Sequence, residues 1–67
     1  MKKDFSKVPA TVTIANVSSE VVGFRYFRVN FVEKLQPADE VVLTVASSEE
    51  VAYYVALEDA NLKVTVA

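Results

Sequence analysis

Apolar and polar side chains alternate over residues 10–17, and this pattern predicts a strand with one buried face. Val12 and Ile14 lie on one side of the expected strand, while threonines occupy the positions between and before them. A period of two is typical of a half-buried strand. Asn16 and the polar residues 18–20 favour a turn after it, because their side chains can hydrogen-bond the local backbone.

The next apolar segment, residues 21–35, changes phase partway along. Its apolar side chains fall first on even positions and then on odd positions: Val22, Phe24 and Tyr26, then Phe27, Val29, Phe31 and Leu35. A slip of one residue moves every side chain to the opposite face of a sheet, so the chain needs a bulge, a bend or a turn near Tyr26–Phe27. Small sandwiches use such bends to pass the chain between sheets.

Two further strands are predicted in the second half of the chain, after a turn at Leu35–Glu40. Pro37 favours that turn because its ring presets φ for the first central position. Residues 41–45 and 62–66 then repeat apolar side chains at every second position. In the last strand the side chains expected to face inward are Leu62, Val64 and Val66.

Residues 47–60 are expected to form the one helix. Ser47 and Glu50 have the spacing of a capping box, in which each side chain bonds the other residue's backbone amide. Asn61 is suited to the left-handed conformation that often ends a helix. A hairpin strand is the alternative, because four apolar residues of this segment also alternate: Val51, Tyr53, Val55 and Leu57.

These elements predict an α+β fold that is mostly β: a small β-sandwich or partly open barrel of four to five strands with one helix near the C-terminus. Residues 10–67 are expected to form a single small domain. Residues 1–9 are expected to be a flexible N-terminal arm that orders on a partner, since chain ends are commonly loose.

The composition removes the usual means of stabilising so short a chain. A domain of about 60 residues buries only about 60% of its unfolded surface, and many such domains rely on disulfides, metals or association. The chain has 67 residues, with no cysteine and no histidine, so disulfides and thiolate or imidazole metal sites are excluded. Since 52% of its residues are hydrophobic, we expect some apolar surface to lie at an interface with another protein or with another copy.

The same composition argues against several classes of function. The net charge is −2, and no basic stripe suited to nucleic acid is present. No apolar run is long enough to span a membrane. With no histidine, the candidate acid–base groups are three carboxylate pairs at predicted turns or helix ends: Asp39-Glu40, Glu49-Glu50 and Glu58-Asp59. A single glycine cannot form a phosphate-binding loop. We therefore expect neither an enzyme nor a protein with a cofactor or metal.

Two clusters have the character of recognition surfaces. Tyr53 and Tyr54 are adjacent on the expected helix and so about 100° apart. If one packs on the sheet, the other points outward and can anchor an interface, although both can instead cap the core. Aromatic residues from Phe24 to Phe31 alternate with arginines, which fits a core covered by arginine stems, a protein interface or a single-stranded nucleic-acid site. The candidate interface residues are Phe5, Arg25, Arg28, Tyr53, Tyr54 and Leu57.

Three segments stand out in the second half of the chain: Leu35–Glu40 (LQPADE), Ser48–Leu57 (SEEVAYYVAL) and Ala60–Val64 (ANLKV). Together they resemble small proteins encoded beside the major capsid protein in tailed-phage and prophage genomes. Those proteins look like head-decoration or head-fibre-base proteins. Where their pattern has glycine, this chain has Ala38 and Asn61, and alanine favours a type I rather than a type II turn.

The resemblance implies a non-enzymatic structural virion protein that binds the capsid surface as a decoration or cement protein, or that anchors a head fibre there. Its expected partners are the major capsid protein or a head-fibre protein, with copies forming a homo-oligomer or lying side by side on the lattice. Its expected location is the virion, after synthesis in the bacterial host cytoplasm. The alternative is a small cytosolic protein-binding module, such as a phage-encoded inhibitor of a host protein.

Overall fold

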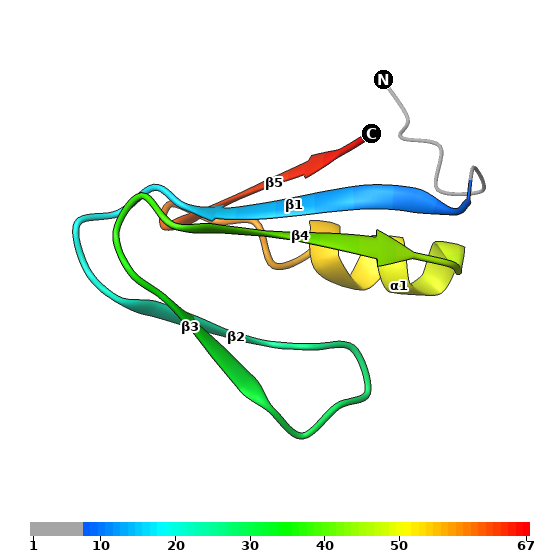
Figure 1. Ribbon diagram of the computed structural model, residues 1–67, viewed down its shortest axis with the longest axis horizontal. Coiled ribbons are helices and arrows are strands. Elements are labelled where there is room, and N and C mark those ends of the chain that lie inside the picture. The colour runs from blue at the N-terminus through cyan, green and yellow to red at the C-terminus, as the bar shows by residue number, and fades with distance from the viewer. Residues whose placement is uncertain (1–7) are drawn as a thin grey trace.

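The computed structural model describes residues 8–67, which form five strands and one helix (Figure 1). In chain order these are β1 (Ala10–Asn16), β2 (Val22–Arg25), β3 (Val32–Leu35), β4 (Glu40–Val45), α1 (Ser48–Val55) and β5 (Leu62–Val66). Most of the predicted N-terminal arm, including Phe5, lies outside the described residues.

The strands form two antiparallel sheets. One has three strands in the order β4-β1-β5, and the other is the hairpin β2–β3. In the larger sheet Ile14 lies opposite Val41 on one side and Val64 on the other. The predicted class, α+β and mostly β with one helix near the C-terminus, is confirmed. The two sheets do not close into a barrel.

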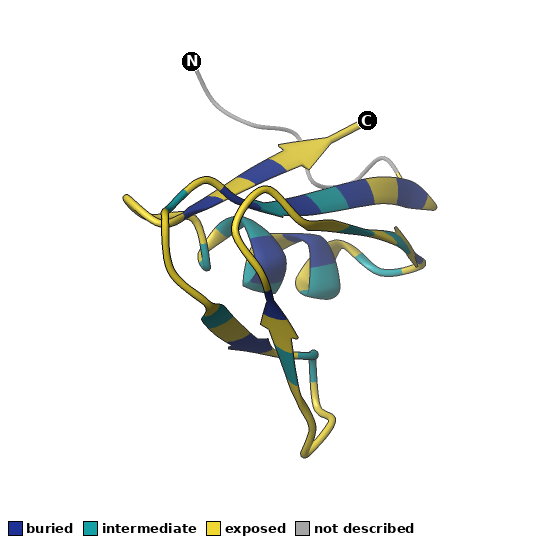
Figure 2. Cartoon of the chain, turned by 60° about the vertical axis from the view of Figure 1, so that its left-hand side comes forward, coloured by how far each residue is buried: buried dark blue, intermediate teal, exposed yellow. Residues whose placement is uncertain are grey.

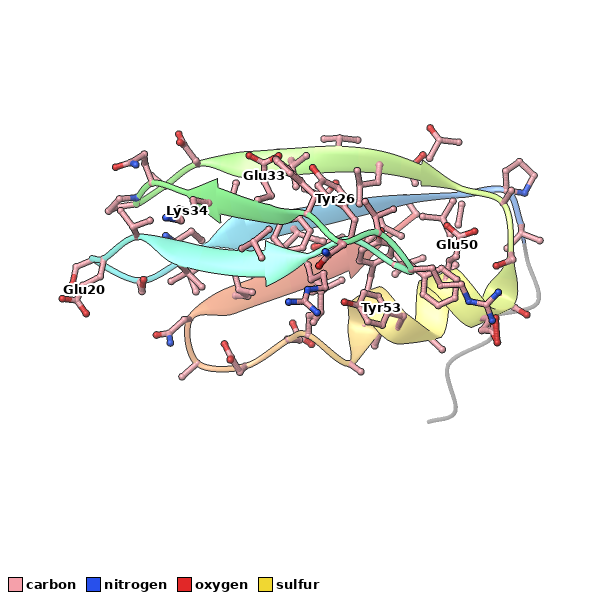
Figure 3. All side chains as sticks on the ribbon, turned by 90° about the horizontal axis from the view of Figure 1, so that it is seen from below. Glu20, Tyr26, Glu33, Lys34, Glu50 and Tyr53 are labelled. Atoms are coloured by element: carbon pink, nitrogen blue, oxygen red, sulfur yellow. The ribbon has the colours of Figure 1, made fainter. Side chains whose placement is uncertain are left out.

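The helix and the hairpin both cover the same face of the three-stranded sheet (Figures 1 and 3). The side chains of Val12 and Ile14 point toward them and are fully buried, whereas Thr11 on the opposite face is exposed. α1 contacts all three strands of this sheet. The buried core is made of Ala10, Val12, Ile14, Phe24, Leu35, Val45, Val51, Tyr54, Leu62 and Val64. Val66, which the alternation placed inward, is 39% exposed at the end of its strand.

The helix begins where the sequence predicts and ends earlier. The Ser47 hydroxyl accepts a hydrogen bond from the Glu50 amide at 3.2 Å, which is one half of the expected capping box. The helix ends at Val55, so the prediction that it continues to residue 60 was wrong. The cause lies at Asp59, whose carboxylate accepts hydrogen bonds from the amides of Asn61 at 2.8 Å and Leu62 at 3.0 Å. This local turn competes with further helix, and Asn61 does not adopt a positive φ.

Asn16 joins the two sheets at the corner of the fold. Its side chain lies on the inward face of β1 and is only 1% exposed. Its amide nitrogen donates to the carbonyl oxygens of Glu20 at 2.7 Å and Leu35 at 2.9 Å, and its oxygen accepts from the Ser18 amide at 2.8 Å. The Ser18 hydroxyl also donates to that oxygen. One buried side chain therefore ties the β1–β2 turn to the end of β3.

The turn between β3 and β4 places a non-glycine residue in a glycine conformation. The Asp39 amide donates to the Gln36 carbonyl at 3.0 Å, so Pro37 and Ala38 are the two central residues. Ala38 has φ 70, which is the sign that type II turns require and type I turns forbid. The predicted type I turn was therefore wrong. The Ala38 amide also donates to the Asn16 carbonyl, and the Asn16 amide donates to the Asp39 carbonyl. Two residues, Ala38 and Asp39, thus lie opposite one, which makes a β-bulge of the type whose first residue is normally glycine.

Replacing Ala38 with glycine should stabilise the domain. A left-handed φ costs an L-residue about 1–2 kcal/mol, and glycine offsets part of that gain through its greater freedom when unfolded. Since the Ala38 side chain is exposed and leaves no cavity, we expect a net gain of about 0.5–1 kcal/mol in the free energy of unfolding. Urea denaturation measures it, and Ala46→Gly, at an exposed position without a positive φ, should be neutral or destabilising.

Candidate protein-binding site

Two tyrosine hydroxyls of α1 attach the hairpin to the helix. The Tyr54 hydroxyl accepts a hydrogen bond from the Phe27 amide at 3.0 Å. The Tyr53 hydroxyl donates to the Arg25 carbonyl at 2.6 Å. Tyr54 is 4% exposed and belongs to the core, whereas Tyr53 is half-buried. Both rings therefore contact the chain's own hairpin, and Tyr53 is the one that retains exposed surface.

The rings between helix and hairpin form a continuous cluster. The centroids of Tyr53 and Tyr54 are 5.1 Å apart and those of Tyr53 and Phe27 are 5.4 Å apart, both edge to face. Edge-to-face pairs at these distances add to the stability that burial gives. The Arg28 guanidinium lies 5.0 Å from the Phe27 ring centroid and pairs with Glu49 at 3.0 Å. Both charged side chains are well exposed, so this ion pair positions Arg28 more than it stabilises the fold.

Arg28 occupies a strained backbone position at the tip of the hairpin. The Val29 amide donates to the Tyr26 carbonyl at 3.2 Å, and Arg28 is the third residue of this turn. Its φ is 55, in the left-handed region that is unfavourable for a long side chain. Strained residues of this kind persist where the surrounding structure holds them, and they gather at binding sites.

The inner side of the hairpin carries a polar contact beside its aromatic rings. The Tyr26 hydroxyl donates to the Glu33 carboxylate at 2.9 Å (Figure 3). The Tyr26 ring lies edge to face with Phe24 at 5.1 Å and stacks on Phe31 at 6.0 Å. Burial, and then the bond to the Glu33 carboxylate, raise the pKa of the Tyr26 hydroxyl above its ordinary value. Tyr26 therefore stays a neutral donor to Glu33 throughout the physiological range.

The far end of the hairpin exposes three large apolar side chains close together in the sequence, which we call the tip patch. They are Val29, 50% exposed, Phe31, 55% exposed, and Val32, 45% exposed. Figure 2 shows the end of the hairpin as an exposed surface that extends away from the buried core. The alternation had placed Val29 and Phe31 on the same face as the buried Leu35. One interpretation of the aromatic residues from Phe24 to Phe31 was that they form the core. It holds for Phe24, which is buried, and fails for Phe31, which is exposed.

The predicted interface residues that the structure describes, which leave out Phe5, fall into three groups. Arg25 and Arg28 are exposed on the hairpin, and Tyr53 is half-buried against it. Tyr54 and Leu57 pack in or against the core. The tip patch was missed as a site, although the phase change at Tyr26–Phe27 could have indicated it, because apolar residues at a tight turn cannot all face inward.

Within residues 8–67, no group of three histidine, cysteine, aspartate or glutamate side chains comes together in a way that could hold a metal ion. No helix in that part of the chain is long and apolar enough to cross a membrane. Each buried side-chain nitrogen or oxygen of the described residues has a hydrogen-bond partner, so none is left aimed at an absent ligand. Comparisons with protein-family models, with curated proteins and with solved structures found no match.

Proposed function

We propose that this chain is a non-enzymatic protein-binding domain that docks on the surface of a phage capsid through its hairpin tip. The observation that carries the proposal is the tip patch, in which Val29, Phe31 and Val32 are each about half exposed. Single apolar side chains on a surface need no explanation, but three of them within four residues at the end of one hairpin form a candidate interaction site. Aromatic and arginine side chains are enriched at protein interfaces, and Arg25 and Arg28 lie beside this patch.

The way the hairpin is held supports its use for binding. Two tyrosine hydroxyls bond its backbone at Arg25 and Phe27, so the residues that lead into the tip are fixed to the helix. A loop that is ordered before binding loses less conformational entropy when it docks. The tip patch is therefore presented on a rigid support, as is usual for binding loops.

The capsid enters the proposal through the resemblance of residues 35–66 to proteins encoded beside major capsid proteins. A capsid repeats one surface many times, so a modest contact for each copy is enough when several neighbouring contacts act together. A tip patch of three side chains suits that situation better than it suits a tight one-to-one complex, which usually buries about 800 Å² on each partner.

The first test is the composition of the particles themselves. Phage particles induced from the source strain and purified on a density gradient should contain this chain, detected by mass spectrometry at a fixed ratio to the major capsid protein. Purified particles that lack this chain would contradict the proposal, and a stable soluble complex with a host protein would favour the inhibitor alternative.

A second test asks whether the tip patch makes the contact. Val29→Ser with Phe31→Ser should weaken binding to shells assembled from the major capsid protein about 10- to 100-fold. Burying a whole side chain of this kind contributes about 1.5–3 kcal/mol, and about half of each is still exposed and left to bury. The matched control is Val17→Ser with Val21→Ser, since these valines are 57% and 50% exposed but lie in the β1–β2 turn. Equal losses in the two double variants, measured by cosedimentation, would place the contact elsewhere.

A further inference from the structure

The three-stranded sheet has two edge strands, and the chain protects only one of them. At β5 the Asp59 amide donates to the Leu62 carbonyl at 3.1 Å, and its carboxylate accepts from the Leu62 amide at 3.0 Å. The Glu58 carboxylate accepts from the Val64 amide at 3.3 Å. The two acidic residues after α1 therefore cover the backbone groups at the start of β5 that a foreign strand would need.

At β4 the hydrogen-bond pattern leaves three residues facing outward. Asn16 exchanges backbone hydrogen bonds with the β4 side, and Thr11 exchanges them with Ala67 on the β5 side. In an antiparallel ladder only every second pair of opposite residues exchanges backbone hydrogen bonds. Between β1 and β4 these pairs join an even residue of β1 to an odd residue of β4. The amides and carbonyls of the even residues of β4 point away from the sheet, and no turn or loop bond among the described residues reaches them. These residues are Glu40, Val42 and Thr44.

This edge has few of the features that discourage pairing. Natural edge strands are usually short or bulged, or they carry lysine or proline. β4 has six residues without either, and its central Val42 is 58% exposed on the open face of the sheet. Figure 3 shows β4 along the margin of the sheet, with the ribbons of the hairpin and helix inside that margin.

We propose that β4 pairs antiparallel with β4 of a second copy, across a two-fold axis at Val42, to give a continuous six-stranded sheet. Only outward-facing residues can exchange hydrogen bonds, and centring the pair on Val42 uses all three of them. Val42 then lies opposite Val42 of the second copy, and Glu40 lies opposite Thr44 of the second copy. A register centred on Glu40 would instead oppose two carboxylates, which is unfavourable. The tip patch takes no part, so this proposal stands independently of the function proposed above.

Sedimentation velocity of the full chain between about 10 µM and about 1 mM tests the association. We expect a monomer–dimer equilibrium, and we expect Val42→Lys to raise the dissociation constant at least tenfold by opposing two ammonium groups. The control Thr65→Lys adds the same charge on the open face of β5 and should leave the constant unchanged. A wild-type chain that remains monomeric throughout, or equal effects of the two lysines, would overturn the proposal.

Disulfide trapping tests the register. The chain has no cysteine, so Val42→Cys and Thr44→Cys each introduce one thiol on an exposed side chain. In the proposed pair the two copies of residue 42 are opposite one another, whereas the two copies of residue 44 are about 14 Å apart, beyond the reach of about 7 Å for a disulfide. Val42→Cys should form a covalent dimer on mild oxidation and Thr44→Cys should not. Equal yields from the two, or no dimer from Val42→Cys, would contradict this register.

Discussion

Replacing Asn16 with alanine should lower the free energy of unfolding by about 3 kcal/mol. The substitution removes both donors to the carbonyls of Glu20 and Leu35 and the acceptor for the Ser18 amide. The Leu35 bond is fully buried, so water cannot replace the donor that is lost. A chain of 67 residues has a total stability of about 3–10 kcal/mol, and the variant should be largely unfolded at the lower end of that range.

The matched control is Asn30→Ala, because Asn30 is exposed in the hairpin loop and surface substitutions change stability by about 0.5 kcal/mol or less. Urea denaturation followed by far-ultraviolet circular dichroism measures both variants. An Asn16→Ala variant as stable as Asn30→Ala would show that the corner does not depend on this side chain.

Asn16→Asp separates hydrogen bonding from shape, since the two side chains have nearly the same size. The aspartate would direct an oxygen at the Glu20 and Leu35 carbonyls, and burial would raise its folded pKa above the unfolded value of about 3.9. A raised carboxyl pKa means that stability is greatest below the unfolded pKa and falls as the pH rises toward the folded pKa. The deficit relative to the wild type should therefore grow from about pH 4 upward.

Replacing Tyr54 with alanine should have the largest effect on the link between helix and hairpin. Truncating a buried aromatic residue costs about 3–5 kcal/mol, and Tyr54 is 4% exposed. The change also removes the acceptor for the Phe27 amide and the edge-to-face contact with Tyr53. We expect the domain to lose most of its stability, which thermal and urea unfolding would both report.

Tyr54→Phe is the conservative control, because it keeps the ring and removes only the hydroxyl. Its expected cost is about 1–2 kcal/mol, with the folded state retained. Tyr53→Phe should lower the free energy of unfolding less than Tyr54→Ala does. It keeps the half-buried ring and removes only the hydrogen bond to the Arg25 carbonyl. If Tyr54→Ala were destabilised no more than Tyr54→Phe, the ring would not be a core element.

The strands and the start of the helix could be predicted because their causes are local. The alternation in residues 10–16 and 41–45 follows directly from one buried face, and Ser47 with Glu50 marks the helix N-terminus. The end of the helix could not be placed, because a side-chain turn at Asp59 competes with helix-forming alanines and the balance depends on β5 lying nearby. Asn16 shares the parity of Val12 and Ile14, yet its polarity suggested a turn alone.

The candidate site depended on contacts that no local pattern contains. Tyr54 and Phe27 are bonded although 27 positions separate them in the chain, so the burial of Tyr54 rather than Tyr53 required the tertiary structure. The phase change at Tyr26–Phe27 predicted a break in the strand but left open a bulge, a bend or a turn. Because a turn was formed, Phe31 was displaced from the core and became part of the tip patch.

The rigidity of the hairpin tip is best measured by ¹⁵N relaxation of the backbone amides from Phe27 to Val29. If the tyrosine bonds hold the hairpin on the helix as the geometry indicates, these amides will have order parameters near about 0.85, equal to those of β1. Values below about 0.6 would mean that the tip moves freely, and would contradict a binding surface that is ordered before its partner arrives.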